Sequence, residues 1–155
     1  MQETGTRINK YMSQCGYWSR READRLIEKG EVWINGTLAT MGTKVMPGDT
    51  VMVHHTTITP CQKEYLLAFH KPAGIVCTTS KIDKNNVIDY LNFPDRIYPV
   101  GRLDKESTGL LLLTNNGQLM DDILRGSNYH EKEYIVHVNK PITDSVLQAM
   151  AQGVP

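Results

Sequence analysis

Residues 100–117, VGRLDKESTGLLLLTNNG, carry the strongest local signal in the chain. A charged segment lies between Gly101 and Gly109, a run of leucines follows, and an Asn-Asn-Gly turn ends it. A short apolar run between turn residues is typical of a strand buried on both faces, although a buried helical turn gives the same pattern. A rigid strand beside a glycine-flanked loop suits a reactive side chain, and Asp104 is the candidate. From these residues alone, a turn hydrogen bond made by Asp104 near Arg102 is the commoner explanation.

The composition predicts a soluble, intracellular protein. The chain has 155 residues, 40% of them apolar, and a formal net charge of zero, which leaves room for one medium or two small domains. The cysteines Cys15, Cys61 and Cys77 are odd in number and far apart, so they fit neither a disulfide framework nor a zinc site and favour a reducing cytoplasm. No apolar stretch reaches the roughly 18 residues that span a bilayer. We therefore expect no membrane partner.

The first part of the chain predicts a small α+β unit. Apolar spacing indicates a helix in residues 6–16, and a capping box formed by Ser19 and Glu22 opens a second helix. An Asn-Gly hairpin and further short strands follow as far as Val53. Residues 54–64 show no periodicity and are interpreted as irregular chain that acts as a linker, with His54 and its neighbour as surface residues.

Basic residues gather in the two predicted helices of this unit. Arg21, Arg25 and Lys29 recur every four residues and so share one helical face. A basic face can neutralise phosphates, but a solvated face with interspersed acidic residues gives the same pattern, so charge alone leaves both explanations open. The full set of candidate RNA-binding residues is Arg7, Lys10, Arg20, Arg21, Arg25 and Lys29.

The second part of the chain predicts another α+β unit. An apolar strand ends in a Lys71-Pro72-Ala73-Gly74 turn, which proline and glycine favour, and residues 75–79 continue as a strand. Helical spacing follows in residues 118–125. Residues 131–138 alternate as a strand that includes Tyr134, which is usually a packing residue in such a position. A last helical pattern begins at Asp144.

The loop motif changes this interpretation, because it resembles that of a known enzyme family. Gly101-Arg102-Leu103-Asp104 followed by Ser107-Thr108-Gly109-Leu110-Leu111 resembles the signature loop of the pseudouridine synthases. The resemblance implies that Asp104 is the essential aspartate and that Arg102 lies beside it. It also implies that the strand at Lys132-Glu133-Tyr134 delivers Tyr134 onto the target base. The active-site support that it implies comes from Lys71, Pro72, Gly101, Leu103 and Gly109.

The order of motifs in residues 5–54 resembles the alpha-L (S-four-like) RNA-binding domain, and this resemblance favours RNA binding by the basic residues. We therefore expect an α+β protein. It has an S-four-like domain in residues 1–54, a linker in 55–64, and the first part of a mixed, antiparallel-sheet pseudouridine synthase domain in 65–155. Members of this family continue beyond the position of Pro155 with further strands and a third motif, so the chain is expected to be partial.

The implied activity is the isomerisation of uridine to pseudouridine in structured RNA. The reaction moves ribose C1′ from N1 to C5 without a redox change, so we expect no cofactor and no metal. Asp104 acts as a nucleophile or as a base on the sugar, and the sequence leaves both open. Arg102 either pairs with Asp104 and lowers its pKa or holds the displaced strand, and Tyr134 offers a stacking surface for a flipped base.

The resemblance is strongest to the F-type large-subunit ribosomal RNA enzymes, and it implies a cytoplasmic monomer that acts on this RNA. Small-subunit ribosomal RNA and tRNA remain alternative substrates. A non-catalytic RNA-binding or ribosome-assembly factor is the alternative from another class. A two-carboxylate glycosidase using Asp104 and Glu106 is disfavoured, since no second acid stands at a recognisable position.

Overall fold

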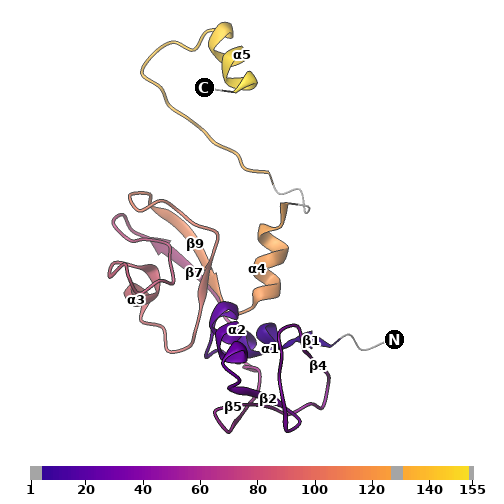
Figure 1. Ribbon diagram of the computed structural model, residues 1–155. Coiled ribbons are helices and arrows are strands. Elements are labelled where there is room, and N and C mark those ends of the chain that lie inside the picture. Colours follow the sequence, from indigo (N-terminus) through magenta and orange to yellow (C-terminus); the bar gives the residue numbers. More distant parts are fainter. Residues whose placement is uncertain (1–4, 127–130, 154–155) are drawn as a thin grey trace.

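The computed structural model describes residues 5–126 and 131–153 (Figure 1). Two hydrophobic cores organise the described chain, one built by residues up to Ile58 and the other by residues from Tyr65 to Leu113. The helices of the described chain are all too short or too polar to cross a membrane.

The first core belongs to a unit of two helices and short antiparallel strands. The strands β1 and β4 pair with each other, and a second sheet has the order β3-β2-β5-β6. The bounds are β1 (Thr6–Arg7), α1 (Ile8–Gln14), α2 (Arg20–Glu28), β2 (Val32–Ile34), β3 (Thr37–Leu38), β4 (Lys44–Val45), β5 (Val51–Val53) and β6 (Thr56–Ile58).

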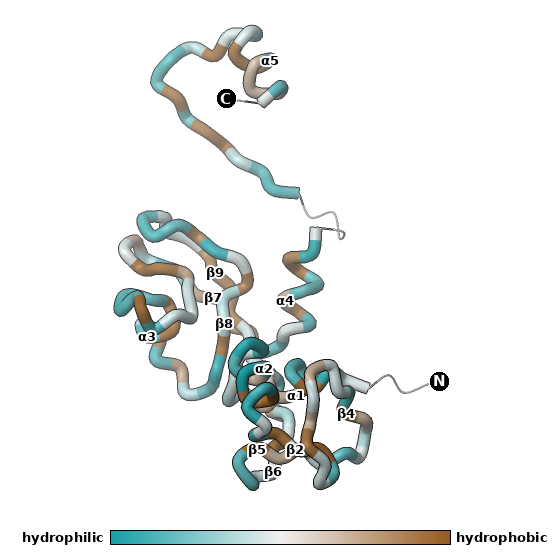
Figure 2. The backbone as a smooth tube through the Cα atoms, in the orientation of Figure 1, coloured by the Kyte–Doolittle hydropathy of each residue, from teal (hydrophilic) through white to brown (hydrophobic). Residues whose placement is uncertain are grey.

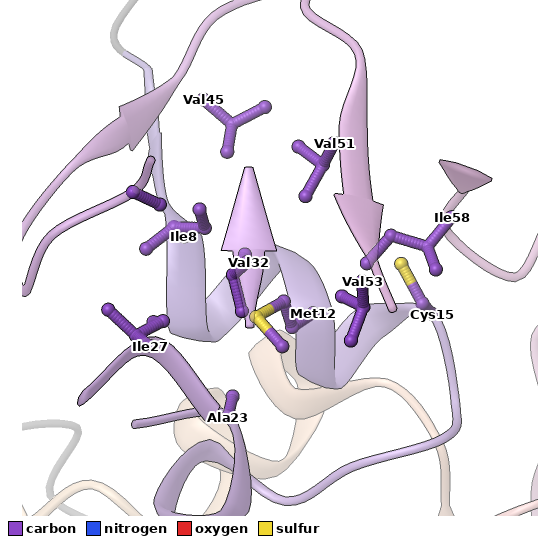
Figure 3. Close-up of a cluster of buried hydrophobic side chains, with 11 residues drawn as sticks. Ile8, Met12, Cys15, Ala23, Ile27, Val32, Val45, Val51, Val53 and Ile58 are labelled. Carbon is purple, nitrogen blue, oxygen red and sulfur yellow. The ribbon is translucent and has the colours of Figure 1, made fainter. Parts of the chain in front are cut away.

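Side chains from both helices and both sheets meet in this core (Figure 3). Met12 from α1 and Val32 from β2 are fully buried at its centre. Burial raises the pKa of the Cys15 thiol to about 12, so this cysteine packs as a neutral, apolar group. The predicted capping box is confirmed, because Ser19 Oγ accepts a hydrogen bond from the Glu22 amide at 3.2 Å and the Glu22 carboxylate accepts one from the Ser19 amide at 2.6 Å.

The chain stays regular where the sequence predicts an irregular linker. His54 and His55 have φ angles of 47° and 63°, and they form a two-residue turn that joins β5 to β6. Ile58, at the end of β6, is buried in the first core. Sequence reasoning missed this hairpin because such turns usually contain asparagine or glycine. Both histidines are exposed as predicted, and the His55 ring stacks on Trp33 with centroids 5.4 Å apart.

The second core lies under an antiparallel sheet with the order β7-β9-β8 (Figure 1). The strand β9 is central and pairs with β7 from Leu66 opposite Thr114 to Lys71 opposite Gly109. The helix α4 packs against β8 and β9. The bounds are β7 (Leu66–Lys71), α3 (Val87–Leu91), β8 (Tyr98–Val100), β9 (Gly109–Thr114), α4 (Gly117–Leu124) and α5 (Asp144–Gln152).

The leucine run forms a strand, as predicted, but only one of its faces is buried. Leu111 and Leu113 point into the second core, whereas Leu110 is 67% exposed on the opposite face. Alternate side chains of a strand lie on opposite faces, so a continuous apolar run does not by itself tell how many faces are covered. The predicted strand at residues 75–79 is also absent. A single bridge from Val76 to Asn86 stands in its place, because this segment packs beside α3 instead of joining the sheet.

Residues 131–138 are extended but do not form the predicted strand. All of them are exposed, and none takes part in a ladder within the described chain. Figure 2 shows this segment passing from hydrophilic to hydrophobic colours, and Figure 1 shows it running away from both cores toward α5. Such a segment is able to join a sheet, but a strand is stable only when a neighbour satisfies its backbone groups.

A buried lysine fastens the loop before β9 to the end of β7. Lys71 is 0% exposed, and its ammonium donates hydrogen bonds to the carbonyl oxygens of Pro72 at 2.9 Å, Lys105 at 3.0 Å and Ser107 at 2.7 Å. An ammonium has three N–H donors, so all of them are used. The Gly74 amide donates a further bond to Lys105 O at 2.8 Å. The loop is therefore held from beneath by the turn that follows β7.

We expect Lys71→Met to lower the free energy of unfolding by about 3 kcal/mol, because the partly buried carbonyls of Pro72 and Ser107 lose their donor and each such loss costs about 1–3 kcal/mol. Urea unfolding followed by far-UV circular dichroism measures this change. The exposed Lys84 provides a matched control, and Lys84→Met should leave the free energy within about 0.5 kcal/mol. Equal stability of the two variants would show that the hydrogen bonds of Lys71 do not hold the loop in place.

Candidate active site

The loop between β8 and β9 presents Asp104 to solvent. The Asp104 carbonyl accepts a hydrogen bond from the Ser107 amide at 3.1 Å, which closes a tight turn. The Asp104 residue is exposed, and within the described chain its carboxylate makes no hydrogen bond or ion pair. The turn explanation therefore accounts for the backbone of Asp104 and not for its side chain. A carboxylate without a protein partner is available to a substrate.

Arg102 shares this loop and is also exposed. No ion pair joins Arg102 to Asp104 within the described residues, where the ion pairs are His54 with Glu31 and Arg125 with Asp121. The structure thus brings the two predicted residues onto one loop without the charge pairing that is one of the two predicted roles of Arg102. Contact with RNA is the other.

The predicted support residues lie beneath or inside this loop. Gly101 has a φ of +79°, a left-handed conformation that glycine adopts without strain, where the chain leaves β8. Leu103 packs against the second core, and its amide lies 3.4 Å from Cys77 Sγ. A Cβ added at Gly109 would lie 3.8 Å from Leu103 Cδ1. Sequence reasoning missed Cys77, which carries no motif and meets the loop only through the fold.

Tyr134 is not brought to the loop in this structure. It is 79% exposed and belongs to the extended segment without strand pairing. Its predicted contact with the target base stays a prediction.

The predicted RNA-binding residues divide into two sets. Arg21, Arg25 and Lys29 are exposed along α2, which Figure 2 shows largely in hydrophilic colours. The other set lines hollows beside the helices and consists of Arg7, Lys10 and Arg20. Sequence reasoning missed Arg96 and Arg125, which line one of these hollows from the second unit, because only the fold brings these distant residues together.

Comparisons with protein families match both parts of the chain. The family described as RNA pseudouridylate synthase matches residues 65–150, and the S4 domain matches residues 6–51. The first match contains the loop with Asp104, and the second contains both helices of the first unit.

Similar proteins extend beyond this chain. The dual-specificity RNA pseudouridine synthase RluF of Salmonella typhi is 51% identical over 155 residues, which cover 99% of this chain and 54% of that protein. RluF of Shigella flexneri is 50% identical, with 99% of this chain and 53% of that protein covered. The ribosomal large subunit pseudouridine synthase B of Bacillus subtilis is 34% identical, with 96% and 62% covered. The chain thus spans about half the length of the RluF proteins.

A solved structure agrees with the predicted α+β fold. A crystal structure of a pseudouridylate synthase has a TM-score of 0.52 and 27% sequence identity, and the match covers 97% of this chain and 66% of that chain. The resemblance found in the loop is confirmed by a family match that includes more than half of the sequence. The chain belongs to the RNA pseudouridylate synthase family.

Proposed function

We propose that the protein carrying this segment converts uridine to pseudouridine in structured RNA, with Asp104 as its essential carboxylate. The observation that carries the proposal is an exposed carboxylate, without a partner among the described residues, on a loop that a buried lysine holds in place. A reactive group works best on such a preorganised mount. Membership of the synthase family supports the choice of reaction.

The chemistry asks for one carboxylate beside the ribose. The C1′–N1 bond breaks and a C1′–C5 bond forms, while a proton leaves C5 and N1 gains one. The uracil base is thus rearranged without oxidation or reduction. Asp104 serves either as a nucleophile or as a base on the sugar, and both roles need one of its oxygens to reach the ribose.

Arg102 and Tyr134 complete the proposed site. A base inside folded RNA must leave its stack, and an aromatic ring stabilises the flipped base. Tyr134 supplies that ring if residues 131–138 pair with a sheet and approach Asp104. Arg102 is placed to contact the RNA, since it is exposed on the loop that carries Asp104.

Large-subunit ribosomal RNA is the proposed substrate, and the large-subunit enzyme of Bacillus subtilis supports this choice. The dual specificity stated for the RluF proteins supports tests on small-subunit RNA and tRNA as well. An S4 domain also suits a non-catalytic RNA-binding factor, which is the second candidate. The domain limits at residues 54 and 65, a cytoplasmic location and a monomeric state stay predictions.

We expect Asp104→Asn to abolish pseudouridine formation and to leave RNA affinity within about twofold of the wild type. The substitution removes the reactive charge from an exposed side chain and leaves the hydrogen bonds between Lys71 and the loop intact. The complete gene product is incubated with unmodified large-subunit, small-subunit and transfer RNA. Pseudouridine is mapped by chemical labelling and primer extension.

Asp83 is exposed in a loop of the same unit, so Asp83→Asn serves as the matched control and should keep full activity. If the Asp104 variant loses affinity and activity to the same extent, the assigned role is wrong. If the wild type binds RNA but modifies none of the three, the binding factor is the better description.

We expect Arg21→Gln combined with Arg25→Gln to weaken RNA binding, because both side chains are exposed cations on one face of α2. The dependence of log Kd on log salt should become shallower by about 0.7–0.9 for each phosphate that the variant no longer neutralises. Binding titrations at several salt concentrations measure this slope. An unchanged slope would assign the face to solvent.

A further inference from the structure

The two units enclose a basic groove at their junction. One hollow of about 610 Å³ takes its walls from both units, and a second of about 400 Å³ lies against α1. Lys10 and Arg20 line both hollows, so the two adjoin at these residues. Figure 1 shows α1 and α2 beside the start of α4, and residues of all three helices line the larger hollow. We call this the junction groove, and its cations are Arg7, Lys10, Arg20, Arg96 and Arg125.

The groove is strongly positive although the chain as a whole is neutral. Among the described residues, its lining holds a single carboxylate, Asp121, which already pairs with Arg125. Within residues 5–126 and 131–153, neither Lys10 nor Arg20 lies in an ion pair. Glu22 lies near the groove, since its pKa is lowered by hydrogen bonds from Ser19 and further by the charge of Arg96. Cations still outnumber carboxylates in the lining, so the groove favours an anionic occupant.

Arg96 gives the groove its two-sided character. Its guanidinium donates a hydrogen bond to the Trp18 carbonyl, so a side chain of the second unit reaches the chain between α1 and α2. A guanidinium has five N–H donors, and this is its one hydrogen bond within the described chain, so the others remain available to a ligand. No carboxylate of the described chain forms an ion pair with Arg96.

The rest of the wall adds no negative charge. Tyr98 donates a hydrogen bond to the Asn115 carbonyl at 2.8 Å, and burial raises the pKa of its phenol, which therefore stays neutral. A Cβ added at Gly117 would lie 3.2 Å from Tyr98 Oη, so this glycine permits the close approach of the ring to α4. Tyr98 is thus a neutral side chain, fixed by its hydrogen bond and by its contact with α4, in the lining between the cations.

We propose that the junction groove binds the sugar-phosphate backbone of the substrate RNA at nucleotides outside the target uridine. Cations from two units along adjoining hollows suit a chain of phosphates better than a single anion. The proposal rests on the proposed function for the identity of the RNA. It extends the sequence-based expectation, because it joins Arg96 and Arg125 of the second unit to Arg7, Lys10 and Arg20 of the first.

The test compares two variants that each remove two positive charges. Arg20→Gln with Arg96→Gln removes a cation from each side of the groove, whereas Lys81→Gln with Lys84→Gln removes exposed charges elsewhere. The complete gene product is titrated against unmodified large-subunit ribosomal RNA fragments at several salt concentrations, with fluorescence anisotropy as the readout.

We expect the groove variant to raise Kd about tenfold or more and to lower the salt slope by about 0.7–0.9 for each phosphate left without its cation. The control should stay within about twofold. A groove variant that binds as well as the wild type, or no worse than the control, overturns the proposal.

Two further variants separate RNA contact from folding. Arg20→Lys with Arg96→Lys keeps the charges and should restore most of the affinity. Arg20→Glu changes an exposed residue in the first turn of α2, where an acidic side chain stabilises a helix, so its unfolding curve should match the wild type while its affinity falls. Unchanged affinity of the well-folded Arg20→Glu variant also overturns the proposal.

The outcome is distinguishable from failure of the proposed function, because binding is measured without catalysis. Absence of pseudouridine with a groove-dependent affinity removes the activity and leaves the groove assignment intact. If pseudouridine forms but RNA affinity does not depend on the groove residues, the groove assignment is wrong and the proposed activity stands. A competition arm decides the class of ligand: poly-uridylate should displace the RNA, and displacement by polyglutamate at equal charge would assign the groove to an acidic protein and overturn the RNA assignment.

Discussion

The ammonium of Lys71 is the interaction on which the geometry of the active-site loop depends. A buried cation is unfavourable unless its donors are all used, and here the donors meet carbonyls of Pro72, Lys105 and Ser107. The cation reaches that place because Lys71 stands opposite Gly109 in the pairing of β7 with β9. A shift of one residue in this register would turn Lys71 to the other face of the sheet. Strand pairing, the buried charge and the position of Asp104 are therefore one coupled arrangement.

The features that the sequence predicted correctly are local ones. The capping box at Ser19 and the strand formed by the leucine run each depend on residues close together in the chain, so composition and spacing reveal them. The loop motif identified the family for the same reason. Residues that matter through distant contacts gave no signal, and Cys77 beneath the loop and Arg96 at the junction are examples. The turn at His54 was missed because its conformation departs from residue preferences.

Tyr134 shows where prediction from pattern stops. Alternating residues in 131–138 describe a chain that is able to pair, and the exposed Leu66 and Leu110 describe a sheet face that is able to receive further packing. The sequence pattern does not reveal which strand residues 131–138 pair with, or which segment packs on the exposed sheet face. The loop that carries Asp104 is supported by residues of the second unit. The approach of Tyr134 to Asp104 depends on strand pairing of residues 131–138, which the described residues do not make. The two parts of the predicted site thus differ in how far this segment alone determines them.

The separation of the two cores has a consequence for the energetics of recognition. The cores share no buried side chain within the described chain, and only the short stretch after Ile58 connects them covalently. Under the proposed function, an RNA held by one unit lies at a high effective concentration beside the other, of the order of millimolar for short linkers. Such tethering multiplies the affinities of two linked binding sites. For the proposed RNA ligand, selectivity then depends on the spacing between two anchor points as much as on any single contact.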